Sequence, residues 1–295
     1  MSIRQANLFQ IFLPLLYLIS ACSSSVDISP TPTATIPPPT ATQTLTPSPI
    51  PPTATATPLT CLTQPGEVKA DVISTTNPPQ EFLIYLPPCY NELTDKKYPV
   101  LYLLHGQTYN QDQWVRLGVP QIADKLFFSN ESPPFIIVFP DDRFWNLPAG
   151  AGFGDRFINH LIPYVDKNYR TNPNRENRFL GGLSRGGGWT IKLGFEHPNL
   201  FSSLGLHSPA IFLDDAPAIE RVIKNIPEES RPRLWVDVGD NDSELDSILL
   251  FEQVLTRIGY IHEFHFYAGS HTEEYWSAHV EEYLRWYASG WVENQ

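Results

Sequence analysis

The sequence predicts an α/β fold with a mostly parallel central sheet and helices on both of its faces. Several runs of five or six residues are almost entirely apolar, which is typical of strands buried on both faces of a parallel sheet. The clearest runs are bounded by Pro or Gly. They alternate with segments whose apolar residues recur at helical spacing, and this alternation is the pattern of a doubly wound sheet.

The expected strands and helices lie between residues 81 and 291. Strands are predicted over residues 81–86, 100–105, 135–139, 178–183, 203–207, 233–238 and 261–267. Helices are predicted over residues 153–168, 186–196, 216–225, 245–258 and 273–291. In sheets of this kind, sites form beyond the carboxyl ends of the strands, so the candidate residues are sought there.

Composition narrows the classes of function. The 295 residues include 20 Lys or Arg and 32 Asp or Glu, for a net charge of −12. Nucleic-acid backbones are bound by clustered Lys and Arg, so no nucleic-acid partner is expected. The hydrophobic content of 42% suffices for a sizeable core. The 29 prolines are about twice the usual share, and their distribution divides the chain.

Residues 1–21 are expected to be an export signal. They carry one charge, Arg4, followed by an apolar run at residues 8–19 that is short for a membrane span. The run ends in Ile-Ser-Ala-Cys, which resembles the lipobox of bacterial lipoproteins, where the Cys sulfur receives a diacylglycerol and the peptide is cut before it. We therefore expect an exported protein whose membrane anchor is a lipid on Cys22. An ordinary secretory signal with an incidental Cys is the alternative.

Residues 22–60 are expected to form a disordered tether. Within residues 29–60 there are 10 Pro and 11 Thr and no charged or aromatic residue. Such a segment cannot bury a core and favours polyproline II. At about 3.1 Å per residue it would hold a domain up to roughly 100 Å from a membrane. Residues 61–295 show no repeat and no second Pro-rich break, so a single extracytoplasmic domain is expected there.

A candidate nucleophile lies between an expected strand and an expected helix. The sequence Gly-Leu-Ser-Arg-Gly at residues 182–186 matches G-x-S-x-G and is centred on Ser184. A nucleophile elbow needs this context, because a sharp turn exposes the hydroxyl and missing side chains let helix and strand approach. The alternative is a Gly-rich turn that only packs.

A serine nucleophile needs a base, and the base needs an orienting acid. Downstream of Ser184, Asp240 and Asp242 follow one expected strand and His271 follows the next, which is the order Ser, acid, His. His262 and His265 lie inside the expected strand and His279 inside the expected helix, so His271 is the best base. At this point either Asp fits.

Oxyanion donors are expected from two backbone amides. The loop after the strand at residues 100–105 donates one N–H group in folds with this nucleophile turn, and the residue after the nucleophile donates the other. These are the amides of Gln107 and Arg185. His105, in the same loop, is expected to shape the turn.

The domain resembles an esterase family of α/β-hydrolases that includes feruloyl esterases, S-formylglutathione hydrolases, enterochelin esterases and mycolyltransferases. The resemblance is carried by Tyr-Leu-Pro-Pro-Cys-Tyr at 85–90, Tyr-Pro-Val-Leu-Tyr-Leu-Leu-His-Gly at 98–106, Leu-Ile-Pro-Tyr-Val-Asp-Lys-Asn-Tyr-Arg-Thr at 161–171, Gly-Gly-Leu-Ser-Arg-Gly-Gly at 181–187 and His-Pro-Asn-Leu-Phe at 197–201. It implies the α/β-hydrolase fold, the acid at the fourth residue of Gly-x-x-Asp, which is Asp242, and the base at His271. The sequence departs from the family at Cys89, where Gly is frequent, and in an oxyanion turn without a Gly-rich run.

The resemblance implies a serine carboxylic-ester hydrolase that forms an acyl-enzyme on a small-molecule or glycan ester and needs no cofactor. No metal site is expected, because the chain contains no H-E-x-x-H and no paired Cys motif. Two alternatives remain: acyl transfer to a sugar or lipid by the same three residues, or a non-catalytic surface binding protein on this fold. The acyl group, the alcohol and the oligomeric state are left open.

Two further expectations concern aromatic residues and cysteines. Five aromatic residues fall near the expected site and would stack on an aromatic acid or a sugar, or else pack in the core: Tyr109, Trp114, Phe144, Trp145 and Trp276. Cys61 and Cys89 are the only cysteines besides Cys22, and in an oxidising compartment they are expected to form a disulfide.

Overall fold

The computed structural model of the protein describes residues 60–143, 152–212 and 215–292. Its eight strands form one sheet in the order β1-β2-β4-β3-β5-β6-β7-β8. The strand pairs β1–β2 and β2–β4 are antiparallel, and every later pair is parallel. The expected α/β fold with a mostly parallel sheet is therefore confirmed. The strands are β1 (Glu67–Ile73), β2 (Gln80–Leu86), β3 (Val100–Leu104), β4 (Ile136–Pro140), β5 (Arg178–Leu183), β6 (Ser203–His207), β7 (Arg233–Asn241) and β8 (Glu263–Ser270).

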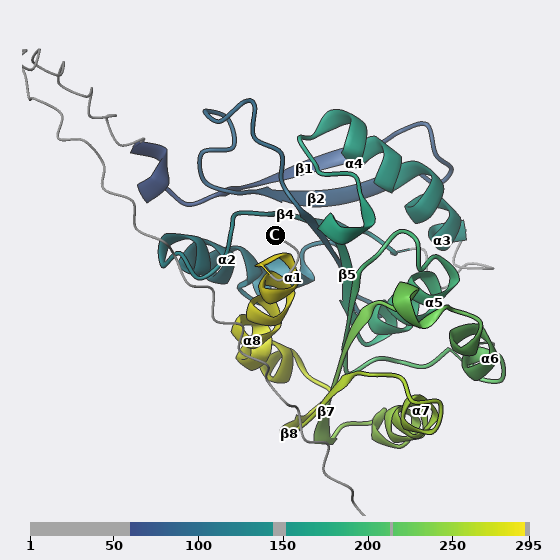
Figure 1. Ribbon diagram of the computed structural model, residues 1–295. Helices are drawn as coiled ribbons and strands as arrows, with labels where there is room; N and C mark the ends of the chain where they lie inside the picture. The colour runs from purple at the N-terminus through teal and green to yellow at the C-terminus, as the bar shows by residue number, and fades with distance from the viewer. Residues whose placement is uncertain (1–59, 144–151, 213–214, 293–295) are drawn as a thin grey trace, which may run out of the picture. The chain divides into compact units, whose positions relative to one another are not determined.

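Helices cover both faces of this sheet (Figure 1). One face carries α3 (Phe153–Arg156), the π-helical turn η3 (Phe157–Leu161), α4 (Ile162–Asn168), α5 (Arg185–Glu196), α6 (Ile219–Lys224) and α7 (Leu245–Arg257). The opposite face carries α1 (Gln113–Arg116), α2 (Val119–Phe128) and α8 (Glu273–Val292). Short 3-10 turns are η1 (Thr60–Thr63), η4 (Arg175–Asn177) and η5 (Glu228–Ser230). Among the described residues, none of the helices is both long and apolar enough to cross a membrane.

The core consists of two apolar layers, one on each face of the sheet. In β3, Val100, Tyr102 and Leu104 face the layer under α4, α5 and α7. Leu101 and Leu103 of the same strand face the layer under α2 and α8. Because alternate side chains of a strand point to opposite faces, a strand buried on both sides must be apolar throughout. This is why the central strands are recognisable in the sequence.

The edge strand β1 was not expected from the sequence. Its residues, Glu-Val-Lys-Ala-Asp-Val-Ile, alternate between polar and apolar, but Val68 and Val72 are exposed. The Asp71 carboxylate instead accepts hydrogen bonds from the hydroxyl groups of Tyr164 and Tyr169. The strand therefore lies with its apolar side chains partly in solvent, because pairing with β2 and the two tyrosines determine which way it faces.

The helices α1 and α2 were also missed, and several boundaries differ from the expected ones. The α6 helix is shorter than residues 216–225, whereas β7 extends to Asn241 and β8 begins at Glu263 and ends at Ser270. In α1 only four residues are helical, which is too short for a helical period to be visible in the sequence.

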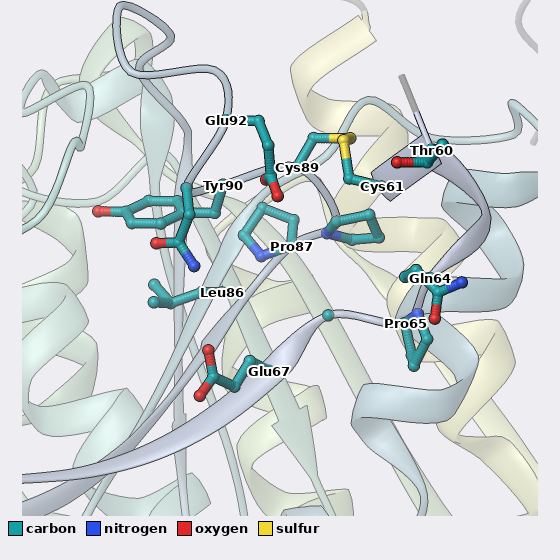
Figure 2. A pocket seen from close by; sticks show the side chains of 13 residues that line it. Thr60, Cys61, Gln64, Pro65, Glu67, Leu86, Pro87, Cys89, Tyr90 and Glu92 are labelled. Carbon is teal, nitrogen blue, oxygen red and sulfur yellow. A yellow bond between two sulfur atoms is a disulfide. The ribbon is translucent and has the colours of Figure 1, made fainter. Parts of the chain in front are cut away.

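A disulfide joins Cys61 in η1 to Cys89 just after β2. Figure 2 shows this bond beside Pro87, in a pocket that also includes Glu67 and Glu92. Because β2 is antiparallel to β4, with Tyr85 opposite Ile137, the carboxyl end of β2 lies near the amino end of β4. The disulfide thus lies at the amino ends of the parallel strands, opposite to their carboxyl ends.

Candidate active site

Ser184 lies in a sharp turn between β5 and α5. Its backbone angles, φ 52° and ψ −121°, are outside the regions that L-residues favour, as expected of a strained strand-to-helix turn. The turn also requires close packing: a Cβ at position 186 would lie 2.2 Å from the carbonyl oxygen of Leu104, so only Gly fits there. The Gly-rich sequence around Ser184 therefore holds the start of α5 against β3.

The structure brings Ser184, Asp242 and His271 together in a hydrogen-bonded chain. Ser184 follows β5, Asp242 follows β7 and His271 follows β8, so all three lie at the carboxyl edge of the parallel strands. His271 Nε2 is 2.8 Å from Ser184 Oγ, and His271 Nδ1 is 2.9 Å from Asp242 Oδ1. This is the geometry of a nucleophile, a base and an orienting acid.

The electrostatics determine the direction of the hydrogen bonds in this chain. Burial favours a raised pKa for Asp242, but hydrogen bonds from His271 and from the backbone N–H of Glu244 outweigh it and lower the pKa. The ionised carboxylate accepts only, so Nδ1 of His271 must carry the proton and donate. Nε2 is then left as the acceptor for the Ser184 hydroxyl.

The loop that carries Gln107, one of the two expected oxyanion donors, packs against the turn at Ser184. A Cβ at Gly106 would come within 3.5 Å of Ser184 Cβ, so the loop after β3 lies against the elbow. The Gly106 N–H donates to Gln113 Oε1 at 2.8 Å, which leaves the exposed Gln107 as the next amide in the loop. Arg185 is the first residue of α5, where the helix dipole favours negative charge.

Two residues near the site were not found by sequence reasoning. Gln113 is fully buried; besides accepting from Gly106, it donates to Glu273 at the start of α8 and so joins the oxyanion loop to the segment after His271. Asp142 accepts from Arg185 Nε at 2.9 Å and from Trp189 Nε1 at 2.7 Å. Burial outweighs these contacts and raises the pKa of Asp142.

Gln113 ends a mostly polar stretch, residues 107–113, so no local signal in the sequence marks it as buried. No such signal exists for Asp142, since its partners Arg185 and Trp189 lie more than forty positions away in the sequence.

The other histidines near the site serve structural contacts. His105 Nδ1 donates to the Gly106 carbonyl at 2.8 Å, and its Nε2 accepts from the Asp142 N–H at 2.7 Å, so it shapes the turn as expected. His265 stacks on Trp235, and His279 stacks on Tyr267. His262 lies just before β8, where Nδ1 donates to the Tyr260 carbonyl, and not inside the strand.

Of the five aromatic residues proposed for a substrate pocket, two are buried in the structure. Trp114 is in α1, is 1% exposed and donates to the Leu104 carbonyl; it is a core residue, and its assignment to the pocket was wrong. Trp276 lies in α8 and not in a loop, and it packs edge-on against His271 with 3% exposure, so it supports the base and forms no open wall. Tyr109 is exposed, beneath the guanidinium of Arg116. Phe144 and Trp145 lie outside the described residues.

Comparison with known proteins identifies the family. Residues 73–287 match the family described as "Putative esterase", and the chain belongs to this family. The match spans the sheet from the end of β1 to α8 and includes Ser184, Asp242 and His271. The family agrees with the α/β-hydrolase fold of the domain.

Several curated relatives are named as esterases, and the chain matches a part of each. An endo-1,4-beta-xylanase/feruloyl esterase of Xylanibacter ruminicola is 31% identical over 171 residues, which is 54% of this chain and 22% of that protein. An esterase of Mycobacterium tuberculosis is 30% identical over 135 residues, 42% of this chain and 28% of that protein. The matches thus span less than a third of either relative.

Solved structures agree on the fold. A ferulic acid esterase superposes with a TM-score of 0.70 at 26% identity, covering 77% of this chain and 99% of that chain. The feruloyl esterase module of Clostridium thermocellum in complex with sinapinate superposes with a TM-score of 0.66 at 20% identity, covering 76% and 88%. The second similarity bears on the fold alone.

Proposed function

We propose that this protein hydrolyses carboxylic esters through an acyl-enzyme on Ser184. The observation that carries the proposal is the unbroken hydrogen-bonded chain from Ser184 Oγ to His271 and on to Asp242. A binding protein on the same fold would have no need to keep these three side chains aligned at one edge of the sheet.

The reaction proceeds in two displacements. Ser184 Oγ attacks the ester carbonyl carbon while His271 Nε2 takes the hydroxyl proton, and the backbone N–H groups of Gln107 and Arg185 stabilise the negative oxygen. His271 returns the proton to the leaving alcohol as the carbon–oxygen bond breaks, which leaves the acyl group on Ser184. A water molecule, deprotonated by His271, then attacks the acyl carbon. The bond to Ser184 Oγ breaks, His271 returns the proton to Oγ, and the carboxylic acid leaves. Asp242 holds the imidazole in the required tautomer throughout.

The substrate class we propose is an ester of a hydroxycinnamic acid with a sugar. Its support is the names of the relatives, since both the Xylanibacter protein and the structure with the TM-score of 0.70 are feruloyl or ferulic acid esterases. Acyl transfer to a second alcohol would use the same residues, so the acceptor has to be tested directly.

The first experiment compares methyl ferulate, a short-chain aryl ester and an acetylated sugar as substrates. Ser184→Ala should lower turnover by roughly 10⁶, because only binding and the oxyanion donors remain. Product analysis with and without an added sugar as acyl acceptor separates hydrolysis from transfer. Full activity in Ser184→Ala would remove the proposal, and preference for the short-chain ester would remove its substrate part.

We also propose that the domain is held at the cell surface. The support is in the sequence: the lipobox-like end of residues 1–21, Cys22, and the Pro- and Thr-rich residues 29–60. Residues 1–59, which contain the signal, Cys22 and nearly all of the tether, lie outside the described residues. In this proposal, a lipid on Cys22 anchors the esterase outside the cytoplasm.

A further inference from the structure

A second His–Asp pair lies beneath the three site residues and takes no part in the proposed reaction. His207, at the end of β6, and Asp237, in β7, are both 0% exposed. His207 Nδ1 is 2.7 Å from Asp237 Oδ2, and the same carboxylate oxygen accepts from Trp235 Nε1 at 2.8 Å. A carboxylate this deeply buried is stable only when its lone pairs are satisfied.

Three tyrosines of α8 complete this cluster. The hydroxyl groups of Tyr275 and Tyr283 donate to Asp237 Oδ1 at 2.8 and 2.9 Å, and the Tyr287 hydroxyl is 3.1 Å from His207 Nε2. Burial and the Asp237 charge raise the pKa of Tyr275 and of Tyr283, so both stay protonated and remain donors. A Cβ at Gly205 of β6 would lie 1.7 Å from the Tyr287 oxygen, so Gly205 provides the space for that ring.

The Asp237 cluster, defined as Asp237 with His207, Trp235, Tyr275, Tyr283 and Tyr287, contacts the site residues through short links. The carbonyl of His207 accepts the backbone N–H of Ser184 at 3.0 Å. On the other side, a Cβ at Gly269 would lie 2.7 Å from Cδ2 of Tyr275, so the end of β8 packs directly against this ring. His271 follows two residues after Gly269.

The two tyrosines bound to Asp237 Oδ1 differ in what else they touch. Tyr275 is in the first turn of α8 and contacts Gly269 at the end of β8, two residues before His271. Tyr283 is two turns further along the helix, and its ring stacks on His207 with 3.7 Å between the ring centroids. The two hydroxyls are therefore equivalent for the carboxylate but not for the base.

We propose that Tyr275, held by Asp237, is a positioning residue for His271. The ring of Tyr275 packs against Gly269 at the end of β8. The hydrogen bond to Asp237 fixes the position of this ring relative to β7, and Asp242 directly follows β7. The distance between His271 and Asp242 then depends on one buried hydroxyl. This inference rests on the proposed function for its kinetic consequence but not for its structural one.

The test compares Tyr275→Phe with Tyr283→Phe. Each variant removes one hydroxyl from the same carboxylate oxygen, so both should lower the melting midpoint by similar amounts. Because a small misplacement of a reacting group is costly, Tyr275→Phe should lower kcat by about tenfold or more, with KM nearly unchanged. Tyr283→Phe should keep kcat within about twofold of wild type, because Tyr283 lies two turns further along α8 with its ring on His207. Equal losses of kcat in the two variants, or none in Tyr275→Phe, would overturn the proposal.

A measurement without substrate separates this inference from the proposed function. The Nδ1 proton of His271, bonded to Asp242, should give a downfield proton resonance that is absent in His271→Asn. In Tyr275→Phe this resonance should shift or broaden by exchange, while in Tyr283→Phe it should stay. If wild type hydrolyses no ester and the resonance still responds only to Tyr275→Phe, the proposed function fails and the positioning role stands. An unchanged resonance in Tyr275→Phe removes the positioning role.

A second pair of variants covers the case in which Tyr275→Phe does not fold. Gly269→Ala disturbs the same contact from the side of β8 and removes none of the hydroxyl groups bound to Asp237. Its control is Gly259→Ala, which also places a side chain at a positive φ but has no atom within 4 Å of the added Cβ. Gly269→Ala should lower kcat and disturb the His271 resonance, and Gly259→Ala should do neither. The same behaviour in both would contradict the proposal.

Discussion

At the scale of single residues, two carboxylates only two positions apart have different partners. Asp240 is exposed in the last part of β7, where its Oδ1 accepts from the Gly269 N–H at 2.9 Å. Asp242 follows the strand, is largely buried, and accepts from His271. Alternation along a strand would place residues 240 and 242 on the same face. They differ because β7 ends at Asn241, after an irregularity in its pairing with β8 between Gly239 and Asn241.

The first prediction compares Asp242→Asn with Asp240→Asn. Asp242→Asn should lower turnover by about 10⁴, because the imidazole loses the partner that fixes its tautomer. Asp240→Asn should cost far less, since the Asn side-chain oxygen can still accept from Gly269. Steady-state kinetics on one aryl ester measures both. A crippled Asp240→Asn beside a near-normal Asp242→Asn would show that the acid has been assigned to the wrong residue.

The second prediction concerns stability and pH. The pKa of Asp242 is lowered in the folded protein by hydrogen bonds from His271 and Glu244, although burial acts in the opposite direction. The unfolded chain therefore binds this proton more readily than the folded protein does. The ionised Asp242 stabilises the fold at pH values above the ordinary pKa of Asp, about 3.9. That contribution is lost as pH falls through the folded-state value. The difference in free energy of unfolding between wild type and Asp242→Asn, measured in urea, should thus shrink as the pH falls below about 4. A difference that stays constant with pH would contradict this prediction.

At the scale of elements, the disulfide-bonded end of the β1–β2 hairpin and the site lie at opposite ends of the strands. Ser184, Asp242 and His271 follow the carboxyl ends of β5, β7 and β8, whereas the disulfide lies after β2, which runs the other way. The loop closed by Cys61 and Cys89 contains β1 and β2, and β1 is at the edge of the sheet, where it pairs on one side only. The bridge therefore restrains the least supported strand at a distance from the chemistry.

The third prediction is that the disulfide contributes to stability and not to catalysis. The bridged residues are separated by 28 positions, and closing a loop of that length contributes about 3–4 kcal/mol on the chain-entropy model. In the double variant Cys61→Ala/Cys89→Ala, the free energy of unfolding measured with denaturant should be lower by that amount. Its kcat below the transition should equal that of wild type. A loss of kcat at unchanged stability would contradict this division.

At the scale of the whole molecule, the domain that carries the site begins near the disulfide. The described part of the chain starts at Thr60, one residue before Cys61, at the edge of the sheet away from Ser184. The proposed tether would therefore attach to the domain at the edge that lacks the site.

The fourth prediction tests the proposed anchor. Cys22→Ala should abolish incorporation of a labelled fatty acid and release the esterase from the membrane fraction, because stable attachment requires acyl chains. Ser23→Ala is the matched control, since it changes the next residue and should leave the label in place. Unchanged processing and membrane retention in Cys22→Ala would show that an ordinary signal was present. Turnover by the purified domain should be the same in all three proteins.

Much about this protein is determined by local sequence. The central strands are buried on both faces and must be apolar throughout, so residues 178–183 and 203–207 are predicted with the bounds that the structure has. The G-x-S-x-G turn and the single well-placed His271 are equally local signals. Family resemblance, and not spacing alone, favoured Asp242 over Asp240.

Only the tertiary structure decided the remaining features. Whether Trp114 lines a pocket or fills the core depends on where α1 packs, and a four-residue helix leaves no period in the sequence. The side of β1 that faces inward is determined by Tyr164 and Tyr169, which lie some ninety positions away. The Asp237 cluster likewise joins β6, β7 and α8. Such contacts depend on distances in space that no local pattern encodes, because each partner is chosen by how the sheet and its helices close around it.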